Sequence, residues 1–352
     1  NGSGSLAVNT TGSSNVAIGL NALVANTTAS NNTAVGTFSL TANTTGHSNV
    51  AMGLNALNDN TTASYNTAVG TYSMDKTTTG SLNTAVGYQA LELNTTGADN
   101  VAVGYQAIKS NTTGISNAAV GLGALQANTT ASQSAAFGHQ ALYTSTTGNY
   151  NTATGYRALF ANTTGQSNTA LGHNAGKTIT SGSNNTFVGQ NTNGSSVTVD
   201  YAAGLGYNLT CAGFYTTLGY SSVDSRLNHG TTTWATVSDE RYKKDITTST
   251  AGLSFINDLT PRTWNYKTLG ELPETFSAYE ADSTKVFKNT QTNHGFIAQE
   301  VKAVIDSHSE IKDGFRLWDD RDDGSQEVAE AALIPVLVKA LQELSAKNDA
   351  LE

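Results

Sequence analysis

The phrase Asn-Thr-Ala-Val-Gly, or a close variant of it, returns every 17 residues along the first half of the chain. The period holds without a slip, and its fifth position is glycine in each copy. A fixed period in this range indicates a repeat architecture and limits the fold more than any local pattern does. The copies begin at Asn15, Asn32, Asn49, Asn66, Asn83, Asn100, Asn117, Ser134, Asn151, Asn168 and Asn185.

Most copies carry two apolar positions, the fourth and the ninth, as in Val35 and Leu40, with Thr154 an exception at the fourth. Seventeen residues are too few for a pair of helices, and Asn, Thr and Gly disfavour helix. The copy is typical of a short strand, a glycine turn, a second short strand and an Asn-Thr-Thr-Gly turn. Stacking joins the apolar rows into ladders, as in a β-solenoid or β-roll. Because each coil holds so few aliphatic side chains, we expect several chains to share one axis, as a trimer.

Charge divides the chain into two regions. Residues 1–236 hold only 6 of the 27 acidic and 5 of the 18 basic residues, and all three prolines follow them. The 17-residue phase weakens after Gly189, and Leu218-Gly219 comes only 13 residues after Leu205-Gly206. We therefore predict a mainly β protein with a shaft at 1–192, degenerate coils and a neck at 193–237, a small α/β domain at 238–332 and a C-terminal helix at 333–352.

Composition excludes several functions. A net charge of −9 argues against binding nucleic acid, which requires clustered Lys and Arg. No apolar run approaches about 20 residues, so membrane insertion is not expected. The histidines show no metal-ligand spacing, no glycine pattern for a nucleotide is present, and we predict neither metal nor cofactor. The run Asp319, Asp320, Asp322 and Asp323 is interpreted as a solvated turn, with a calcium loop as the alternative. The chain begins inside a repeat, so we expect it to be the C-terminal part of a longer protein.

Two motifs of the repeats could carry function. Glycoside cleavage needs two carboxyl groups about 5–9.5 Å apart, and six acids over 236 residues predict that neither one coil nor two neighbouring coils offers them. Asn-Thr-Thr matches a glycosylation sequon, but sugars would crowd coils about 4.8 Å apart, so we interpret it as a turn. The sequons begin at Asn26, Asn43, Asn60, Asn94, Asn111, Asn128 and Asn162.

Aromatic residues follow the glycine in several copies. Tyr88 and Tyr105 occupy the same position in adjacent copies and should stack about one strand spacing apart. An exposed aromatic row on a polar rod suits a host-surface glycan or protein receptor, and packing against a neighbouring protomer is the alternative. The candidate surface-binding residues are Phe38, Tyr72, Tyr88, Tyr105 and Tyr156.

Two resemblances follow from these motifs. The repeats over residues 15–192 resemble the shorter head repeats of trimeric autotransporter adhesins, whose coils carry a comparable Val-Ala-Ile-Gly phrase. Three phrases after the repeats resemble the intramolecular chaperone of endosialidase, a self-cleaving domain of phage tailspikes and tail fibres. These phrases are Ser238–Ile246, Asn293–Val301 and Leu333–Leu344. The resemblance implies a homotrimer that the chaperone assembles and from which the chaperone is then released.

The resemblance also implies a serine–lysine dyad. Its positions here are Ser238 and Lys243, and the cut falls between Val237 and Ser238. A serine hydroxyl becomes a nucleophile once a base takes its proton, and a partly buried lysine can serve. Lys244 is the rival base. Asp239 and Arg241 belong to the same motif and are expected to order the loop. The enzyme activity predicted is therefore autoproteolysis in cis, with a helix-start signal at Ser-Asp-Glu as the alternative interpretation.

The last helix carries a heptad pattern. Its apolar spacing of 3, 4, 3, 4, 3 predicts a coiled coil with one asparagine in the core. The Leu and Ile residues in this pattern are compatible with both a dimer and a trimer, whereas the resemblance implies a trimer. The seam residues are Ile334, Leu337, Leu341, Leu344, Asn348 and Leu351.

Together these observations predict a viral tail fibre or tailspike shaft that attaches to the host surface, joined upstream to virion attachment proteins. One alternative is a bacterial trimeric surface adhesin with the same chaperone. The other is the C-terminal part of a glycan-degrading tailspike whose catalytic domain lies upstream of Asn1.

Overall fold

The computed structural model describes residues 2–231, 234–236, 240–276, 278–311, 317–320 and 325–351. Within these ranges the side chains of residues 234–236, 242 and 320 are not described. The chain divides into two compact units, Asn1–Ser238 and Asp239–Glu352, and each is described by itself.

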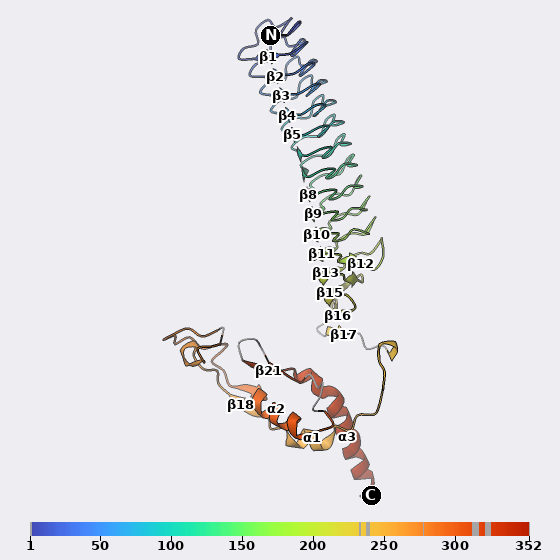
Figure 1. The fold of residues 1–352 in the computed structure, drawn as a ribbon, viewed down its shortest axis with the longest axis vertical. Coiled ribbons are helices and arrows are strands. Elements are labelled where there is room, and N and C mark those ends of the chain that lie inside the picture. The colour runs from blue at the N-terminus through green and yellow to red at the C-terminus, as the bar shows by residue number, and fades with distance from the viewer. Residues whose placement is uncertain are drawn as a thin grey trace. The chain divides into compact units, whose positions relative to one another are not determined.

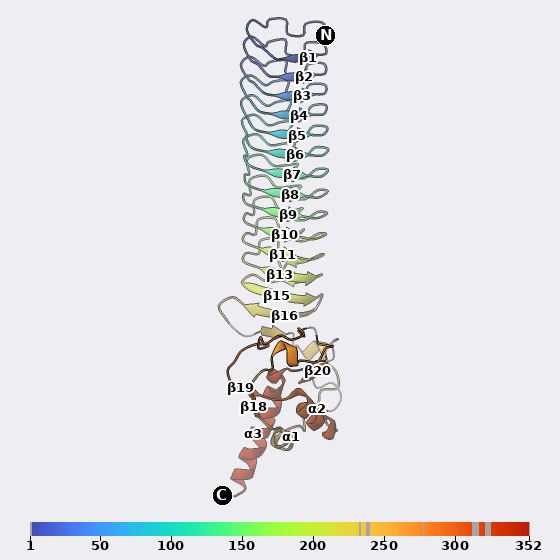
Figure 2. The same cartoon turned by 90° about the vertical axis from the view of Figure 1, so that its left-hand side faces the viewer.

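The first unit is a β-solenoid of about 12 turns, as the period predicts. Each coil contributes one strand to a parallel sheet, and each residue pairs with the residue 17 positions later, as in Val16 with Thr33. Figures 1 and 2 show these strands stacked in chain order along one side of the coils. The strands are β1 (Val16–Ile18), β2 (Thr33–Val35), β3 (Val50–Met52), β4 (Thr67–Val69), β5 (Thr84–Val86), β6 (Val101–Val103), β7 (Ala118–Val120), β8 (Ala135–Phe137), β9 (Thr152–Thr154), β10 (Thr169–Leu171) and β11 (Thr186–Val188).

The sheet continues past the regular repeats. Strand β13 (Ala203–Tyr207) pairs with β15 (Tyr215–Tyr220) in parallel at a spacing of 13 residues. Strands β16 (Val223–Asn228) and β17 (Trp234–Thr236) then close the sheet as antiparallel neighbours. The short strands β12 (Asn193–Gly194) and β14 (Thr210–Cys211) pair beside it. The shorter spacing therefore marks the last parallel coil before the chain reverses.

The second strand predicted for each coil does not form. The ninth-position residues lie in turns, with a left-handed backbone such as φ 52° at Leu23 and φ 49° at Leu40. This conformation is rare for a residue with a Cβ. It turns the eighth and ninth side chains inward one after the other, as at Ala22 and Leu23, which an alternating strand cannot do. The prediction was wrong because the pattern of apolar residues does not reveal the backbone torsion.

The interior of the solenoid is built from small apolar residues and asparagines. The strand alanines, such as Ala34, and the ninth-position leucines, such as Leu40, are fully buried. The asparagine that opens nearly every copy after the first is buried as well. In Asn49 the backbone N–H donates to Asn32 Oδ1 at 3.0 Å, and Nδ2 donates to the Ala63 carbonyl at 2.9 Å. Buried polar groups must be paired in this way, so the asparagines act as rungs between coils.

The sequon asparagines form a second buried ladder, which supports the turn interpretation. Asn43 Nδ2 donates to Asn26 Oδ1 at 3.0 Å and to the Gly46 carbonyl at 2.9 Å. An amide nitrogen that is buried and donates twice has no room for a glycan. The fully buried members are Asn26, Asn43, Asn60, Asn94, Asn111, Asn128 and Asn162.

The fourth-position row faces outward. In β1 the burial alternates as exposed, buried and exposed, so Ala17 points into the solenoid and Val16 and Ile18 point out. The second and fourth positions of the copies, which are the first and third residues of each strand, together form what we call the outer sheet face. Figure 2 views the solenoid from this side. Its exposed large apolar members are Val16, Ile18, Met52, Val86, Val101, Val120, Phe137, Leu171, Leu205 and Leu218, each 37–55% exposed.

The second unit has mixed helices and short strands. Its core is formed by apolar side chains of α1, α2 and α3, including Phe255, Val301, Ile305 and Val336. The elements are η1 (Glu240–Tyr242), α1 (Leu253–Asp258), β18 (Arg262–Trp264), η2 (Leu269–Glu271), β19 (Asn293–Gly295), α2 (Ala298–Ser307), β20 (Trp318–Asp320), β21 (Gln326–Val328), η3 (Glu330–Leu333) and α3 (Ile334–Asp349). Strands β18 and β19 pair antiparallel, as do β20 and β21.

Helix α3 holds α1 in place. The Glu343 carboxylate accepts a hydrogen bond of 2.8 Å from the backbone N–H of Leu253, at the start of α1. This bond lowers the pKa of Glu343. A Cβ on Gly252 would lie 2.6 Å from the same carboxylate, so a larger residue there would displace the Glu343 side chain from this bond. Two distant segments of the chain thus meet through one side chain.

Candidate functional sites

The segment of the proposed cut is described only in part. Val237, Ser238 and Asp239 lie outside the described residues, so the geometry of the serine–lysine dyad stays a prediction. The single-turn helix η1 begins at Glu240, and the Lys243 N–H donates to the Glu240 carbonyl at 2.9 Å. This turn is compatible with both the dyad and the helix-start interpretation.

Both candidate bases are exposed in the isolated chain. Lys243 and Lys244 come directly after η1 and are exposed. Arg241, which lies within η1, is exposed as well. A lysine that takes a proton from serine needs a neutral amine, which burial favours. If Lys243 is the base, its amine must be buried by the residues around the cut or by another chain, because burial favours the neutral form.

The candidate surface-binding aromatics form two separate groups. Tyr88 and Tyr105 stack with ring centroids 5.4 Å apart, as the 17-residue spacing predicts, and Tyr72 meets Tyr88 edge-on at 6.3 Å. Tyr156 belongs to a different stack, three coils further along. Phe38 is exposed but enters neither group. The single continuous aromatic row expected from the sequence is therefore interrupted, because Leu122 holds the corresponding place in the coil between them.

Sequence reasoning missed most of the second group. His139 and His173 stack on either side of Tyr156, at 5.3 and 5.0 Å between ring centroids. Tyr143 and Phe160 stack at 5.3 Å with an interplanar angle of 4°. Both stacks follow the same 17-residue spacing, so extending the search to histidine and to the tenth position of the repeat would have found them.

The prediction that neighbouring coils hold no paired carboxylates was wrong. Acids spaced by the length of one repeat lie side by side in successive coils. Lys76 Nζ lies 3.1 Å from both Asp59 Oδ2 and Asp75 Oδ2, and Lys109 pairs with Glu92 at 3.4 Å. The period that brings the acids together also brings their partners, so these carboxylates form an ion-pair ladder.

Asp75 is the buried member of this ladder. Its side chain is only 8% exposed. Burial raises the pKa of its carboxyl group, and the hydrogen bond from Lys76 opposes that rise. Lys76 in turn has a raised pKa, chiefly because of its hydrogen bond to Asp75. The arrangement stabilises these ionised groups by pairing them.

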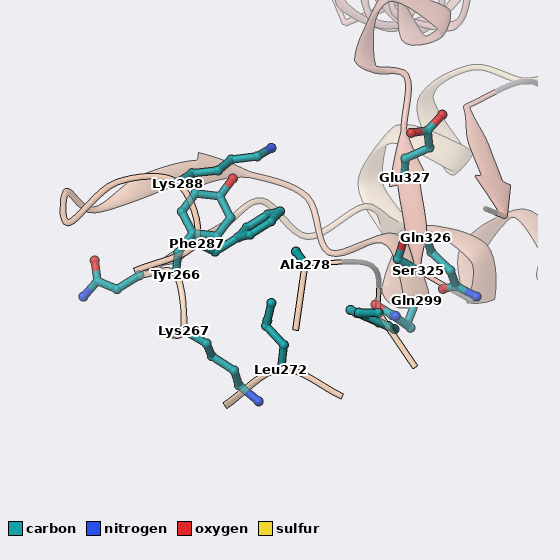
Figure 3. Close-up of a pocket in the computed structure, with 12 residues that line it drawn as sticks. Tyr266, Lys267, Leu272, Ala278, Phe287, Lys288, Gln299, Ser325, Gln326 and Glu327 are labelled. Atoms are coloured by element: carbon teal, nitrogen blue, oxygen red, sulfur yellow. The ribbon is translucent and has the colours of Figure 1, made fainter. Parts of the chain in front are cut away.

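The C-terminal unit contains a cavity of about 470 Å³. Figure 3 shows Tyr266, Phe287 and Lys288 on one wall and Gln299, Gln326 and Glu327 on the other. The Lys288 ammonium lies 5.5 Å from the centroid of the Tyr266 ring and 5.6 Å from that of Phe287. The lining combines aromatic and aliphatic side chains with amide and charged groups.

His308 forms the most polarised cluster of the same unit. Its Nδ1 lies 2.9 Å from Glu310 Oε1 and its Nε2 lies 2.8 Å from Asp258 Oδ2, while its ring meets Phe255 edge-on. The hydrogen bond to Glu310, followed by that to Asp258, raises the pKa of His308. The protonated ring thus bridges the end of α1 and the segment after α2.

This cluster predicts a pH-dependent stability. A raised pKa in the folded state means that the stabilising contribution of His308 is complete below about pH 6.5 and is lost as pH rises through the folded value. We expect the C-terminal unit to melt at a higher temperature at pH 6 than at pH 8.5, and His308→Gln to reduce that difference. Melting is followed by tryptophan fluorescence, because Trp264 and Trp318 lie in this unit. The exposed His294, changed to Gln, is the control, and an equal effect of both changes would contradict the assignment.

The predicted seam of α3 is exposed along its length. Leu333, Val336 and Ala340 pack into the unit, whereas the other apolar stripe points outward. The exposed large apolar members of the seam are Ile334, Leu337, Leu341, Leu344 and Leu351. Self-association through this stripe stays a prediction.

Two further classes of site were sought among the described residues. No cluster of three or more His, Cys, Asp or Glu side chains there could hold a metal ion. Of the acidic run, Asp319 and Asp320 lie in β20, and Asp322 and Asp323 fall outside the described ranges. Within the same residues, none of the helices has both the length and the apolar character needed to span a bilayer.

Comparison with known proteins identifies one segment. Residues 238–309 match the family model described as chaperone of endosialidase, a peptidase family. The match includes the first two of the three phrases noted in the sequence, and Leu333–Leu344 lies beyond it. No curated protein and no solved structure matches the chain.

Proposed function

We propose that this chain is the shaft of a homotrimeric viral tail fibre or tailspike, which contacts the host surface and is assembled by its C-terminal chaperone. The chaperone-of-endosialidase match at residues 238–309 and the β-solenoid in front of it support this architecture. The observation that carries the proposal is the outer sheet face, an apolar surface that extends along the solenoid.

The outer sheet face exposes apolar area along one side of the solenoid. Its ten exposed large apolar side chains are each 37–55% exposed and together present on the order of 700 Å². A standard interface buries about 800 Å² per partner. Association of identical chains would cover this face coil by coil, because every chain carries the same 17-residue spacing.

Helix α3 presents a second exposed apolar stripe with heptad spacing. Its exposed leucines include Leu337, Leu341 and Leu344, and a coiled coil would bury them. The two exposed apolar surfaces belong to different units of one chain, so self-association accounts for both. The choice of a trimer over a dimer rests on the resemblance of the C-terminal phrases to the chaperone of endosialidase.

Association can be tested by placing charge on the outer sheet face. The double variant Val86→Glu/Val120→Glu should sediment as a monomer or aggregate, whereas the wild type should show the mass of three 36.5 kDa chains, or of the corresponding pieces after cleavage. Burying a charge without a partner in an interface costs several kcal/mol. The measurement is analytical ultracentrifugation.

The matched control is Thr96→Glu/Thr130→Glu, which adds the same charge at the same 34-residue separation on exposed turns. It should leave the mass unchanged. A monomeric wild type, or a Val86→Glu/Val120→Glu variant that still forms trimers, would remove the support that this face gives to the proposal.

Release of the chaperone follows from the proposed dyad. Lys243 accepts the Ser238 hydroxyl proton while Oγ attacks the Val237 carbonyl carbon. The C–N bond then breaks, the Ser238 nitrogen takes the proton, and an ester remains. Water hydrolyses the ester, leaving a Val237 carboxylate and a Ser238 with a free amine and a restored hydroxyl. The family match begins at Ser238, which supports this position for the cut.

The dyad predicts complete loss of cleavage on substitution. Ser238→Ala and Lys243→Ala should each give one full-length band on a denaturing gel, while the wild type gives pieces of 237 and 115 residues. Lys244→Ala is the control for the rival base and should cleave normally. Intact mass of the wild type is decisive, because a trimer that stays uncut would refute the dyad without refuting the trimer.

A further inference from the structure

Two aromatic stacks lie close to a single arginine in the coils of β8, β9 and β10. One stack contains His139, Tyr156 and His173, which are exposed; the other contains Tyr143 and Phe160, which are half-buried. All five residues come after the ends of their strands and are not part of the outer sheet face. They present a row of parallel rings to solvent.

Arg157 joins the two stacks. Its guanidinium carbon lies 5.3 Å from the centroid of the Tyr156 ring and 5.0 Å from that of Phe160, within the range of a cation–π contact. Its Nε donates to Gln140 Oε1 at 2.8 Å. The guanidinium is therefore held by two rings and one hydrogen bond, which leaves the Nη edge to bind a ligand.

The charge around Arg157 is not compensated. Residues 100–199 contain Lys109, Arg157 and Lys177 and no aspartate or glutamate, in a chain whose net charge is −9. Lys109 pairs with Glu92. No ion pair among the described residues involves Arg157. An arginine held in place without a carboxylate, in a locally cationic stretch of an acidic protein, favours an anionic ligand.

We infer that this cluster, the Arg157 platform (His139, Tyr143, Tyr156, Arg157, Phe160 and His173), binds an acidic saccharide. Because the rings stack on one another, they offer a row of apolar ring edges against which the C–H groups of a pyranose ring can pack. The guanidinium fork matches a carboxylate with two parallel hydrogen bonds. A nucleic acid is disfavoured because its phosphates require several clustered cations, and the platform holds a single guanidinium.

The platform has a natural comparison in the same shaft. The Tyr88 and Tyr105 stack has glutamines, Gln89 and Gln106, where the platform has Arg157, and their side chains bond to each other at 2.7 Å. This second stack offers rings without a cation. The inference rests on the proposed role in host-surface attachment and adds the class of ligand and the place where it binds.

The experiment compares full-length wild type with Arg157→Gln on an array of sialylated, uronate-containing and neutral saccharides. Glutamine occupies the same repeat position in the preceding coil, at Gln140, so the fold should be kept, and melting temperature and sedimentation check this. We expect the wild type to prefer carboxylated saccharides and Arg157→Gln to lose about tenfold or more in affinity for them. Arg157→Lys, which keeps the charge but not the fork, should lose less than Arg157→Gln.

The matched control is Lys177→Gln, which removes a positive charge from the same acid-free stretch but outside the platform and should bind acidic saccharides as the wild type does. A wild type that binds no carboxylated saccharide better than neutral ones would overturn the platform, as would an Arg157→Gln variant with wild-type affinity. Failure of binding with an intact trimer contradicts only the platform. A monomeric wild type contradicts the proposed assembly and leaves the saccharide result to be judged separately.

Discussion

Replacing Gly121 by alanine is expected to lower the stability of the shaft by at least about 3 kcal/mol. Gly121 has φ +137°, which residues with a Cβ rarely adopt, and a Cβ there would lie 2.7 Å from the carbonyl carbon of Gly138 in the next coil. The obstacle is backbone, so no side chain can move aside. Relief requires the two coils to separate, which breaks the hydrogen bonds on both sides.

Gly123 in the same coil is the matched control. Its φ is +63°, and the atoms nearest to an added Cβ, at 3.2 Å, belong to the side chains of Tyr143 and Gln126. Neighbouring coils carry Gln106 and Gln140 at this position. Gly123→Ala should therefore cost about 1 kcal/mol. The midpoints of guanidinium unfolding, followed by far-ultraviolet circular dichroism, should separate the two variants, and equal midpoints would show that the close approach of the coils is not what requires glycine.

The second large effect is expected for Asn100→Leu, a change of similar side-chain volume. The Asn100 side chain bridges three coils. Its Nδ2 donates to Asn83 Oδ1 at 3.2 Å and to the Gly114 carbonyl at 2.9 Å, and its Oδ1 accepts from the backbone N–H of Asn117 at 3.0 Å and from Asn117 Nδ2 at 3.1 Å. Leucine leaves the buried Asn117 N–H without a partner. We expect a loss of about 2–4 kcal/mol in the free energy of unfolding.

The chain supplies the control for this substitution. Ser134 stands in the asparagine row, and its Oγ accepts from the Asn151 N–H at 3.2 Å. Asn100→Ser keeps an acceptor for the Asn117 N–H, so it should cost less than leucine despite the cavity it leaves. If Asn100→Leu lowered the free energy of unfolding no more than Asn100→Ser, then packing of the side chain, and not its hydrogen bonds, would hold the coils together.

The 17-residue period predicts the pairing of the sheet residue by residue. Val16 meets Thr33 because one coil separates them, and Tyr88 stacks on Tyr105 for the same reason. Applied consistently, the period would also have shown that Asp59 and Asp75 are neighbours. The error about the acids came from treating separation along the chain as separation in space.

The direction of each side chain could not be predicted in the same way. Val35 and Leu40 are both apolar, yet Leu40 is fully buried and the valine row points outward. The difference depends on the left-handed torsion of residues such as Leu40, which turns two successive side chains inward. No residue type in the row requires that torsion.

The sequence alone therefore determined the repeat, the register of the coils, the change of character near residue 237 and the chaperone phrases, because all of these depend on the order and spacing of residues. Only the tertiary structure decided which apolar row fills the solenoid and which remains exposed to a partner. It also decided that Arg157 lies against Tyr156 and Phe160 without a carboxylate. These outcomes depend on backbone torsions and on which side chains the coil brings into contact.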